Sequence, residues 1–191
     1  MLRRRSTWVY LLFALALGLC FSLLLQDCSP KEAAAGSSLR DEYLGDLVCR
    51  NCHEEAYQDW LHSHHDLAMQ KATEATVLGD FSGQTLTSHG LTSRFFQRDG
   101  KFFVHTEGPD GKPEDFEVKY TFGVQPLQQY MVEFPGGRLQ CLLLAWDSEA
   151  NKWFDLMPDQ RVPPDDWLHW TKGSMTWNTM CADCHSTYLE K

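Results

Sequence analysis

The sequence predicts an α+β fold, in which helices and loops surround two Cys-x-x-Cys-His motifs and an antiparallel β-meander is inserted between them. Three observations predict this arrangement. The motif occurs twice, at Cys49–His53 and at Cys181–His185. Apolar side chains recur at helical spacing after the first motif. Strand-like runs separated by turn dipeptides fill residues 91–157.

Residues 53–75 are expected to form an amphipathic helix. Ala56 and Tyr57 are followed by Trp60 and Leu61, three to four residues later, with acidic and amide side chains between the two pairs. This helix would present one apolar face to the rest of the domain.

The β-meander is predicted from its turns. Asp99-Gly100 separates two strand-like runs, Arg94–Arg98 and Lys101–Glu107, and is a strong signal for a two-residue hairpin. Pro135-Gly136-Gly137 marks a later turn in the same region. Within it Cys141 lies in an apolar strand and is expected to be a buried free thiol without an assigned role.

The N-terminus predicts export. Three arginines, Arg3–Arg5, precede an apolar run from Trp8 to Leu25, so residues 1–28 are expected to be a signal peptide or an N-terminal membrane anchor. A linker rich in small residues is expected over 29–42, and the folded domain over 43–191. The expected location is the bacterial periplasm, either free or anchored to the inner membrane.

Composition limits the partners. The formal net charge is −9, which disfavours binding to nucleic acid and favours basic redox partner proteins. Aromatic residues make up 13% of the chain, which suits a protein that buries large flat surfaces.

The two Cys-x-x-Cys-His motifs predict covalent attachment of two c-type haems. Cysteines three residues apart lie on one face of a helical turn, where each thiol can form a thioether with one vinyl group of haem. The histidine that follows then supplies an axial nitrogen to the iron. The expected thioether residues are Cys49, Cys52, Cys181 and Cys184, and the expected proximal iron ligands are His53 and His185.

Three other roles of these cysteines fit the sequence less well. Cysteines of a zinc site usually lie closer in sequence than two pairs that start 132 residues apart. A redox-active Cys-x-x-Cys usually follows a strand in a βαβ unit, which the sequence does not predict. Structural disulfides suit an exported chain, but a spacing of three residues is tight for one.

Each iron is also expected to need a second axial ligand. If residues 53–65 form one straight helix, His53 and His65 are separated by roughly 18 Å, whereas two nitrogens on one iron are only about 4 Å apart. His65 or His64 is therefore expected to bind the other haem or a haem outside this chain. His169 and then His89 are the next candidate distal ligands.

The sequence resembles the multihaem cytochromes c, in particular the cytochrome c-554-like tetrahaem electron carriers. The residues that match the first haem segment of this family are Cys49-Arg50-Asn51-Cys52-His53, Trp60, Ser63, His65 and Ala68-Met69. The resemblance implies that His65 ranks above His64 as a distal ligand.

Later segments, such as Met180–Thr187, resemble larger bacterial multihaem cytochromes that carry tetratricopeptide repeats. The resemblance implies haems with two histidine ligands and electron transfer. It also implies that the chain is the N-terminal portion of a longer protein, with further haem modules C-terminal to it.

The main functional hypothesis is an electron carrier in the periplasm. The alternative is part of a multihaem oxidoreductase that acts on a small nitrogen or sulfur compound, and whether the protein is an enzyme stays open. An enzyme needs an iron with an exchangeable sixth position, so carbon monoxide binding would distinguish the two hypotheses.

Overall fold

The computed structural model describes residues 45–186, and most of this part is an antiparallel β-sheet. Its nine strands follow in chain order: β1 (Met69–Lys71), β2 (Ser82–Ser88), β3 (Leu91–Arg98), β4 (Lys101–Glu107), β5 (Pro113–Phe122), β6 (Leu127–Phe134), β7 (Arg138–Cys141), β8 (Leu144–Asp147) and β9 (Lys152–Asp155). The helices are short: α2 (Asp46–Arg50), α3 (Glu54–Trp60), the 3₁₀ turn η2 (Gly173–Met175), α4 (Trp177–Met180) and α5 (Ala182–His185).

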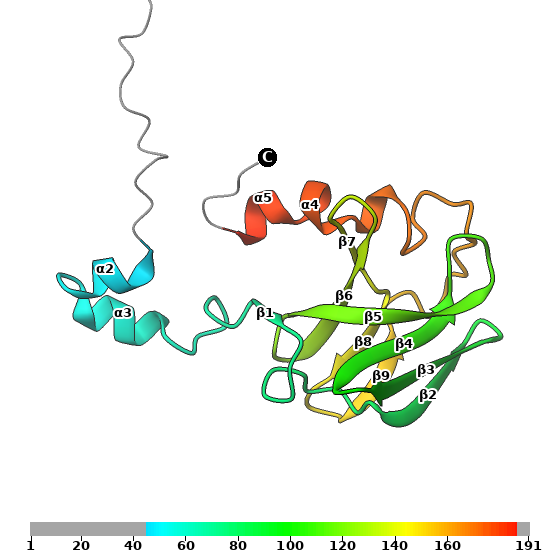
Figure 1. Cartoon of the computed structure of the whole chain (residues 1–191), viewed down its shortest axis with the longest axis horizontal. Helices are drawn as coiled ribbons and strands as arrows, with labels where there is room; N and C mark the ends of the chain where they lie inside the picture. The colour runs from blue at the N-terminus through cyan, green and yellow to red at the C-terminus, as the bar shows by residue number, and fades with distance from the viewer. Residues whose placement is uncertain (1–44, 187–191) are drawn as a thin grey trace, which may run out of the picture. The chain divides into compact units, whose positions relative to one another are not determined.

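The sheet has the order β2-β3-β4-β5-β6-β8-β9, with β1 paired to β5 and β7 paired to β6. Its ends curl toward each other, so that β2 and β9 are in contact (Figure 1). At this junction the Ser88 hydroxyl donates a 2.6 Å hydrogen bond to Asp155. The curled sheet therefore encloses its apolar side chains.

Tight turns set the register of the first three strands of this order. Asp99 and Gly100 both have positive φ, and Arg98 pairs with Lys101 across the turn, which confirms the predicted hairpin. His89 and Gly90 form an equivalent turn between β2 and β3.

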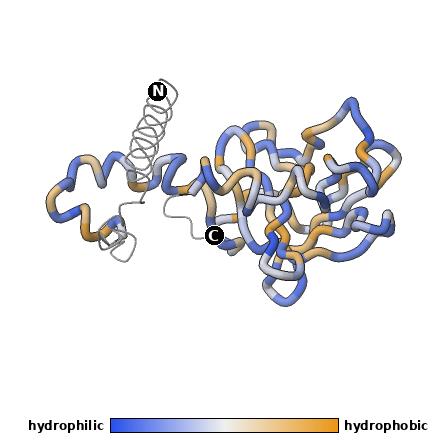
Figure 2. Tube along the Cα trace, turned by 90° about the horizontal axis from the view of Figure 1, so that it is seen from above, coloured by the Kyte–Doolittle hydropathy of each residue, from blue (hydrophilic) through white to orange (hydrophobic). Residues whose placement is uncertain are grey.

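The core lies inside the curl and is strongly aromatic. Phe95 is fully buried and stacks on Trp153 with ring centroids 3.5 Å apart. Phe81 meets four aromatic rings edge to face. Burial alternates along β3 and β4, as the period of two of a strand requires, and Figure 2 shows hydrophobic and hydrophilic residues interspersed along the chain.

The predicted fold class is wrong. The described chain is a curled antiparallel sheet with few helical residues, and not an α+β domain of haem-binding helices with a β-insert. The predicted helix over 53–75 ends at Trp60, because Leu61 is extended and His62 has a φ of 64°. The sheet already begins at β1 and β2, before the predicted start of the insert at residue 91.

The predicted N-terminal segments, 1–28 and 29–42, lie outside the described residues. Among residues 45–186, no helix has the length and apolar character that crossing a membrane requires.

Candidate haem-attachment sites

The first motif forms a helical turn between α2 and α3. The carbonyl oxygen of Cys49 accepts hydrogen bonds from the backbone N–H of Cys52, at 3.2 Å, and from that of His53, at 3.0 Å. The turn continues into α3, whose first bond runs from the Tyr57 N–H to the His53 carbonyl. Gly45, with a φ of 77°, precedes α2 in a conformation that favours glycine.

The second motif repeats this backbone geometry in a separate part of the chain. The carbonyl oxygen of Cys181 accepts hydrogen bonds from Cys184, at 3.1 Å, and from His185, at 3.0 Å. The two motifs thus share one local structure, although their remaining residues differ.

This local structure fits a c-type haem. In each motif two thiols and one imidazole lie within a single helical turn, which is the donor set that covalent haem attachment needs. Cys49, Cys52 and Cys184 are exposed, as are both motif histidines, and Cys181 is half-buried. The thioether and proximal-ligand assignments stay predictions, and five of these six residues are exposed.

An ion pair follows the first motif. Arg50 bonds Glu54 at 2.8 Å, and its guanidinium lies 5.5 Å from the centre of the Tyr57 ring. The hydrogen bond from Arg50 lowers the pKa of Glu54. These contacts join α2, which contains Cys49, to α3.

The second motif packs on the sheet. The His185 ring meets Phe122, at the end of β5, edge to face with centroids 5.0 Å apart. Trp177 and Ala182, on either side of Cys181, are buried in a cluster with Met131 and Cys141. The sheet therefore holds the second motif in a fixed place.

The histidines after the first motif do not lie on a helix. His64 and His65 are both exposed and belong to the turns between α3 and β1. The straight helix assumed for the separation of about 18 Å between His53 and His65 is therefore absent. Both residues remain candidate distal ligands, now on a chain segment that turns.

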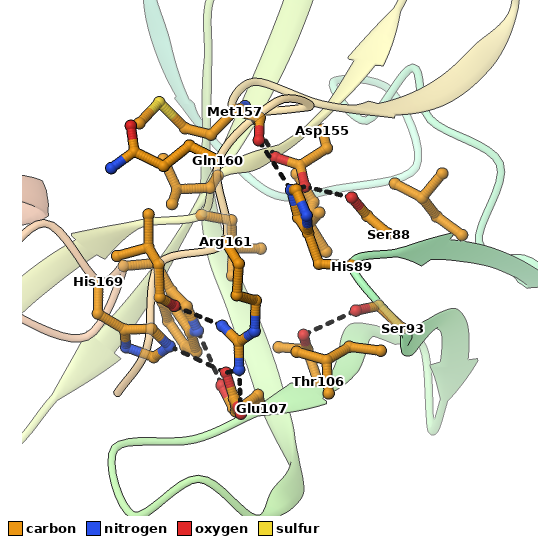
Figure 3. Close-up of a pocket in the computed structure, with 17 residues that line it drawn as sticks. Ser88, His89, Ser93, Thr106, Glu107, Asp155, Met157, Gln160, Arg161 and His169 are labelled. Atoms are coloured by element: carbon orange, nitrogen blue, oxygen red, sulfur yellow. Dashed lines mark hydrogen bonds and ion pairs between the residues drawn. The ribbon is translucent and has the colours of Figure 1, made fainter. Parts of the chain in front are cut away.

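His89 and His169 line one pocket, together with the charged side chains of Glu107, Asp155 and Arg161 (Figure 3). The cavity within this pocket has a volume of about 70 Å³, and the pocket is partly open to solvent. The fold thus brings together two of the four predicted distal ligands, which are 80 residues apart in the sequence.

Both of these histidines already have partners in the pocket. His89 Nε2 is 3.0 Å from the carbonyl oxygen of Met157. His169 is buried, with Nδ1 2.9 Å from the Thr171 hydroxyl and Nε2 3.4 Å from Glu107. Iron ligation by His169 would have to replace one of these contacts.

An ion pair between exposed Arg161 and nearly buried Glu107, beside His169, was not predicted. The Arg161 guanidinium donates two 2.8 Å hydrogen bonds to the carboxylate of Glu107, which is only 9% exposed. No motif links these two residues, which are 54 positions apart. Burial lowers the pKa of His169, while the neighbouring Glu107 acts in the opposite direction.

Cys141 is buried and free, as the sequence predicts. Its contact with Cys181 was missed, because only the folded chain brings β7 and α4 together. Among residues 45–186, no group of three or more histidine, cysteine or acidic side chains is arranged to hold a metal ion.

One comparison with known proteins gave a match. A family model described as cytochrome c554 and c-prime matches residues 48–109, which include the first motif, His64, His65 and strands β2 to β4. No curated protein and no solved structure matches the chain. The match covers less than half of the chain, but it supports a cytochrome c family and therefore a c-type haem.

Proposed function

We propose that this chain, a c-type cytochrome by its family match, binds two haems covalently and transfers electrons in the bacterial periplasm. One observation carries the proposal. The motif outside the matched segment, at Cys181–His185, forms the same hydrogen-bonded turn as the motif inside it. A second attachment site is therefore supported by local structure as well as by its sequence.

The residues that would hold each haem follow from the two turns. Cys49 and Cys52 would bind the first haem and His53 its iron, and the corresponding residues at the second site are Cys181, Cys184 and His185. When bound, the haem iron supplies reversible one-electron reduction, whose potential depends on its axial ligands, burial and nearby charge.

The protein orients the groups that bind haem. In each motif, two backbone hydrogen bonds to the first cysteine fix the turn, so the second cysteine and the histidine keep their spacing. At the second site, Phe122 packs against His185 and restricts rotation of the imidazole.

The periplasmic location rests on the sequence. Arg3–Arg5 and the apolar run after them are typical of an exported or anchored chain, and a thiol must be in its reduced form when it adds to a vinyl group of haem. The formal charge of −9 favours basic redox partners, and salt should weaken their association.

Haem stoichiometry tests the proposal. The full chain is produced in a bacterium with the c-type maturation machinery, and its intact mass is measured after denaturation. We expect the mass of two haems on the full chain and of one haem on either double variant, Cys49→Ala/Cys52→Ala or Cys181→Ala/Cys184→Ala. Cys141→Ser is the matched cysteine control and should retain two haems.

Two results would contradict the proposal. A full chain without added haem mass, in a host that matures other c-type cytochromes, would exclude covalent attachment. A full chain with one haem that only the first double variant loses would exclude the second site, and would leave the family assignment intact.

A further inference from the structure

A third thiol lies beside the second motif. Cys141, the last residue of β7, is 2% exposed and belongs to the same buried cluster as Cys181. Cys181 packs against this cluster, and its thiol interacts with the thiol of Cys141, so the two cysteine side chains are neighbours.

Several hydrogen bonds fix this placement. Thr176, which precedes α4, forms a β-bridge with Gln140 and donates a 2.6 Å hydrogen bond to its side chain. Asn178 accepts a 2.8 Å hydrogen bond from the Leu139 N–H and donates one to the Gly137 carbonyl. The segment before Cys181 is thus held along β7, and the contact between the two thiols follows from that docking.

The two cysteines of the second motif differ in surroundings. Cys184 is exposed, whereas Cys181 is half-buried and faces Cys141. Burial raises the pKa of Cys141 to about 12, so it stays a thiol at neutral pH in the reduced protein. A small disulfide oxidant would therefore reach Cys181 before it could reach Cys141.

We propose that Cys141 is the disulfide partner of Cys181 in the haem-free chain, and that this bond masks the second attachment site until a thiol reductant opens it. The masking rests on the proposed haem function, whereas the disulfide itself rests only on the contact between β7 and the second motif. Among residues 45–186, no third thiol packs against the first motif as Cys141 does against the second.

The Cys141–Cys181 bond would form by thiol–disulfide exchange, through a mixed disulfide with the oxidant. Cys181, as the thiolate, attacks a low-molecular-weight or protein disulfide and releases one thiol of that oxidant. Cys141 loses its proton and attacks the Cys181 sulfur, which forms the Cys141–Cys181 bond and releases the second thiol. Two electrons pass from the cysteine pair to the oxidant disulfide, and reduction by a dithiol reverses the reaction.

Reduction of the disulfide also restores the free Cys181 thiol, which haem attachment needs. A Cys181 sulfur engaged with Cys141 cannot add to a vinyl group, because it is no longer a thiol. Once Cys181 forms a thioether, Cys141 has lost its partner and remains a buried free thiol. The oxidised haem-free chain and the haem-loaded chain are therefore mutually exclusive states of Cys181.

Peptide mapping of the haem-free chain tests the disulfide. The full chain is produced without maturation factors, reduced, and equilibrated with oxidised glutathione. The remaining thiols are alkylated in denaturant, and proteolytic fragments are analysed without reduction. We expect most Cys181 to be linked to Cys141 in the full chain and in Cys184→Ser, and this link to be absent in Cys141→Ser.

The variant Cys184→Ser keeps both cysteines of the pair, so it decides the question even if Cys141→Ser does not fold. The proposal would be overturned if the full chain showed Cys49–Cys52 and Cys181–Cys184 as its only disulfides among these cysteines, with Cys141 alkylated. A second readout is haem mass after oxidised or reduced chain is supplied to a maturation system. Oxidation should selectively lower attachment at the second site in the full chain but not in Cys141→Ser.

The two proposals can fail separately. A chain that shows the Cys141–Cys181 link but never takes up haem would refute the proposed function and retain the disulfide. A chain that binds two haems but forms only the pairs within each motif would refute the disulfide and retain the proposed function.

Discussion

Thr176 donates a 2.6 Å hydrogen bond from its hydroxyl to the side-chain oxygen of Gln140, and this contact joins the second motif to the sheet. The Gln140 side-chain nitrogen donates to the carbonyls of Trp170 and Lys172, at 2.8 and 2.9 Å. Gln140 is fully buried, so one side chain satisfies three polar groups of the segment that leads into Cys181.

Gln140→Leu is expected to release that segment. The substitution removes one hydrogen-bond partner from each of three polar groups. The Thr176 hydroxyl and the Lys172 carbonyl keep a 3.3 Å hydrogen bond to each other, and a buried group left unsatisfied costs about 1–3 kcal/mol. Because part of the segment can open to water, we expect a total loss of about 3 kcal/mol in the free energy of unfolding. Urea unfolding and protease sensitivity near Trp170 to Cys181 would measure it.

Gln97→Leu is the control, because Gln97 is exposed on β3. It should leave both the unfolding midpoint and the protease pattern close to those of the unaltered chain. Equal effects of the two substitutions would mean that Gln140 has no special part in holding the second motif.

The candidate distal ligands differ in their surroundings, and this predicts different results for their alanine variants. His65 is exposed, whereas both ring nitrogens of His169 lie near protein partners. In the haem-loaded chain we expect His65→Ala to open a coordination position on one iron. A high-spin absorption band and binding of carbon monoxide to the reduced protein would report it.

His169→Ala should instead leave the spectrum unchanged and lower stability. His64→Ala tests the neighbouring exposed histidine, and His105→Ala is the control, because His105 bonds Asp115 on the sheet. Carbon monoxide binding by His169→Ala alone would reverse this ranking. Binding by the unaltered chain would favour the oxidoreductase alternative.

The strands were predictable to a large extent because their signals are local. Asp99-Gly100 predicts the β3–β4 hairpin, since a two-residue turn needs positive φ at both positions. The helix predicted over 53–75 was wrong for a different reason. Its spacing is helical, but residues after Trp60 turn and then join β5 through β1, and pairing with a distant strand is absent from local periodicity.

In the candidate site, too, some features follow from local sequence and others depend on distant parts of the chain. Cysteines in Cys-x-x-Cys-His define their own turn, so the sequence predicts which residues would bind haem. The neighbours of Cys181 come from elsewhere in the chain. Cys141 and Phe122 reach the second motif only through the order of β5, β6 and β7, which no local pattern encodes.

The buried position of His169 predicts how the free energy of unfolding of the haem-free chain depends on pH. Burial lowers its pKa in the folded state, against about 6.5 in an unfolded chain. As pH falls below about 6.5, the unfolded chain binds a proton that the folded chain does not, so stability falls by up to about 1.4 kcal/mol per pH unit. Above that pH this contribution is constant.

His169→Gln should reduce this slope, as measured by urea unfolding between about pH 7.5 and 5.5. Glu107, Arg161 and Lys172 also act on His169, so a slope that survives His169→Gln would assign it to another group.

Two adjacent phenylalanines on β3 test the packing of the curled sheet. Phe95 is fully buried against Trp153, whereas Phe96 points to the other face, where it stacks on Phe103 beneath Arg98. Phe95→Ala should cost about 3–5 kcal/mol in the free energy of unfolding, as large-to-small core substitutions do. Phe96→Ala removes only cross-strand contacts of about 1 kcal/mol. Urea unfolding of the haem-free chain would compare them, and a Phe96 variant as unstable as the Phe95 variant would show that the two faces of β3 had been assigned incorrectly.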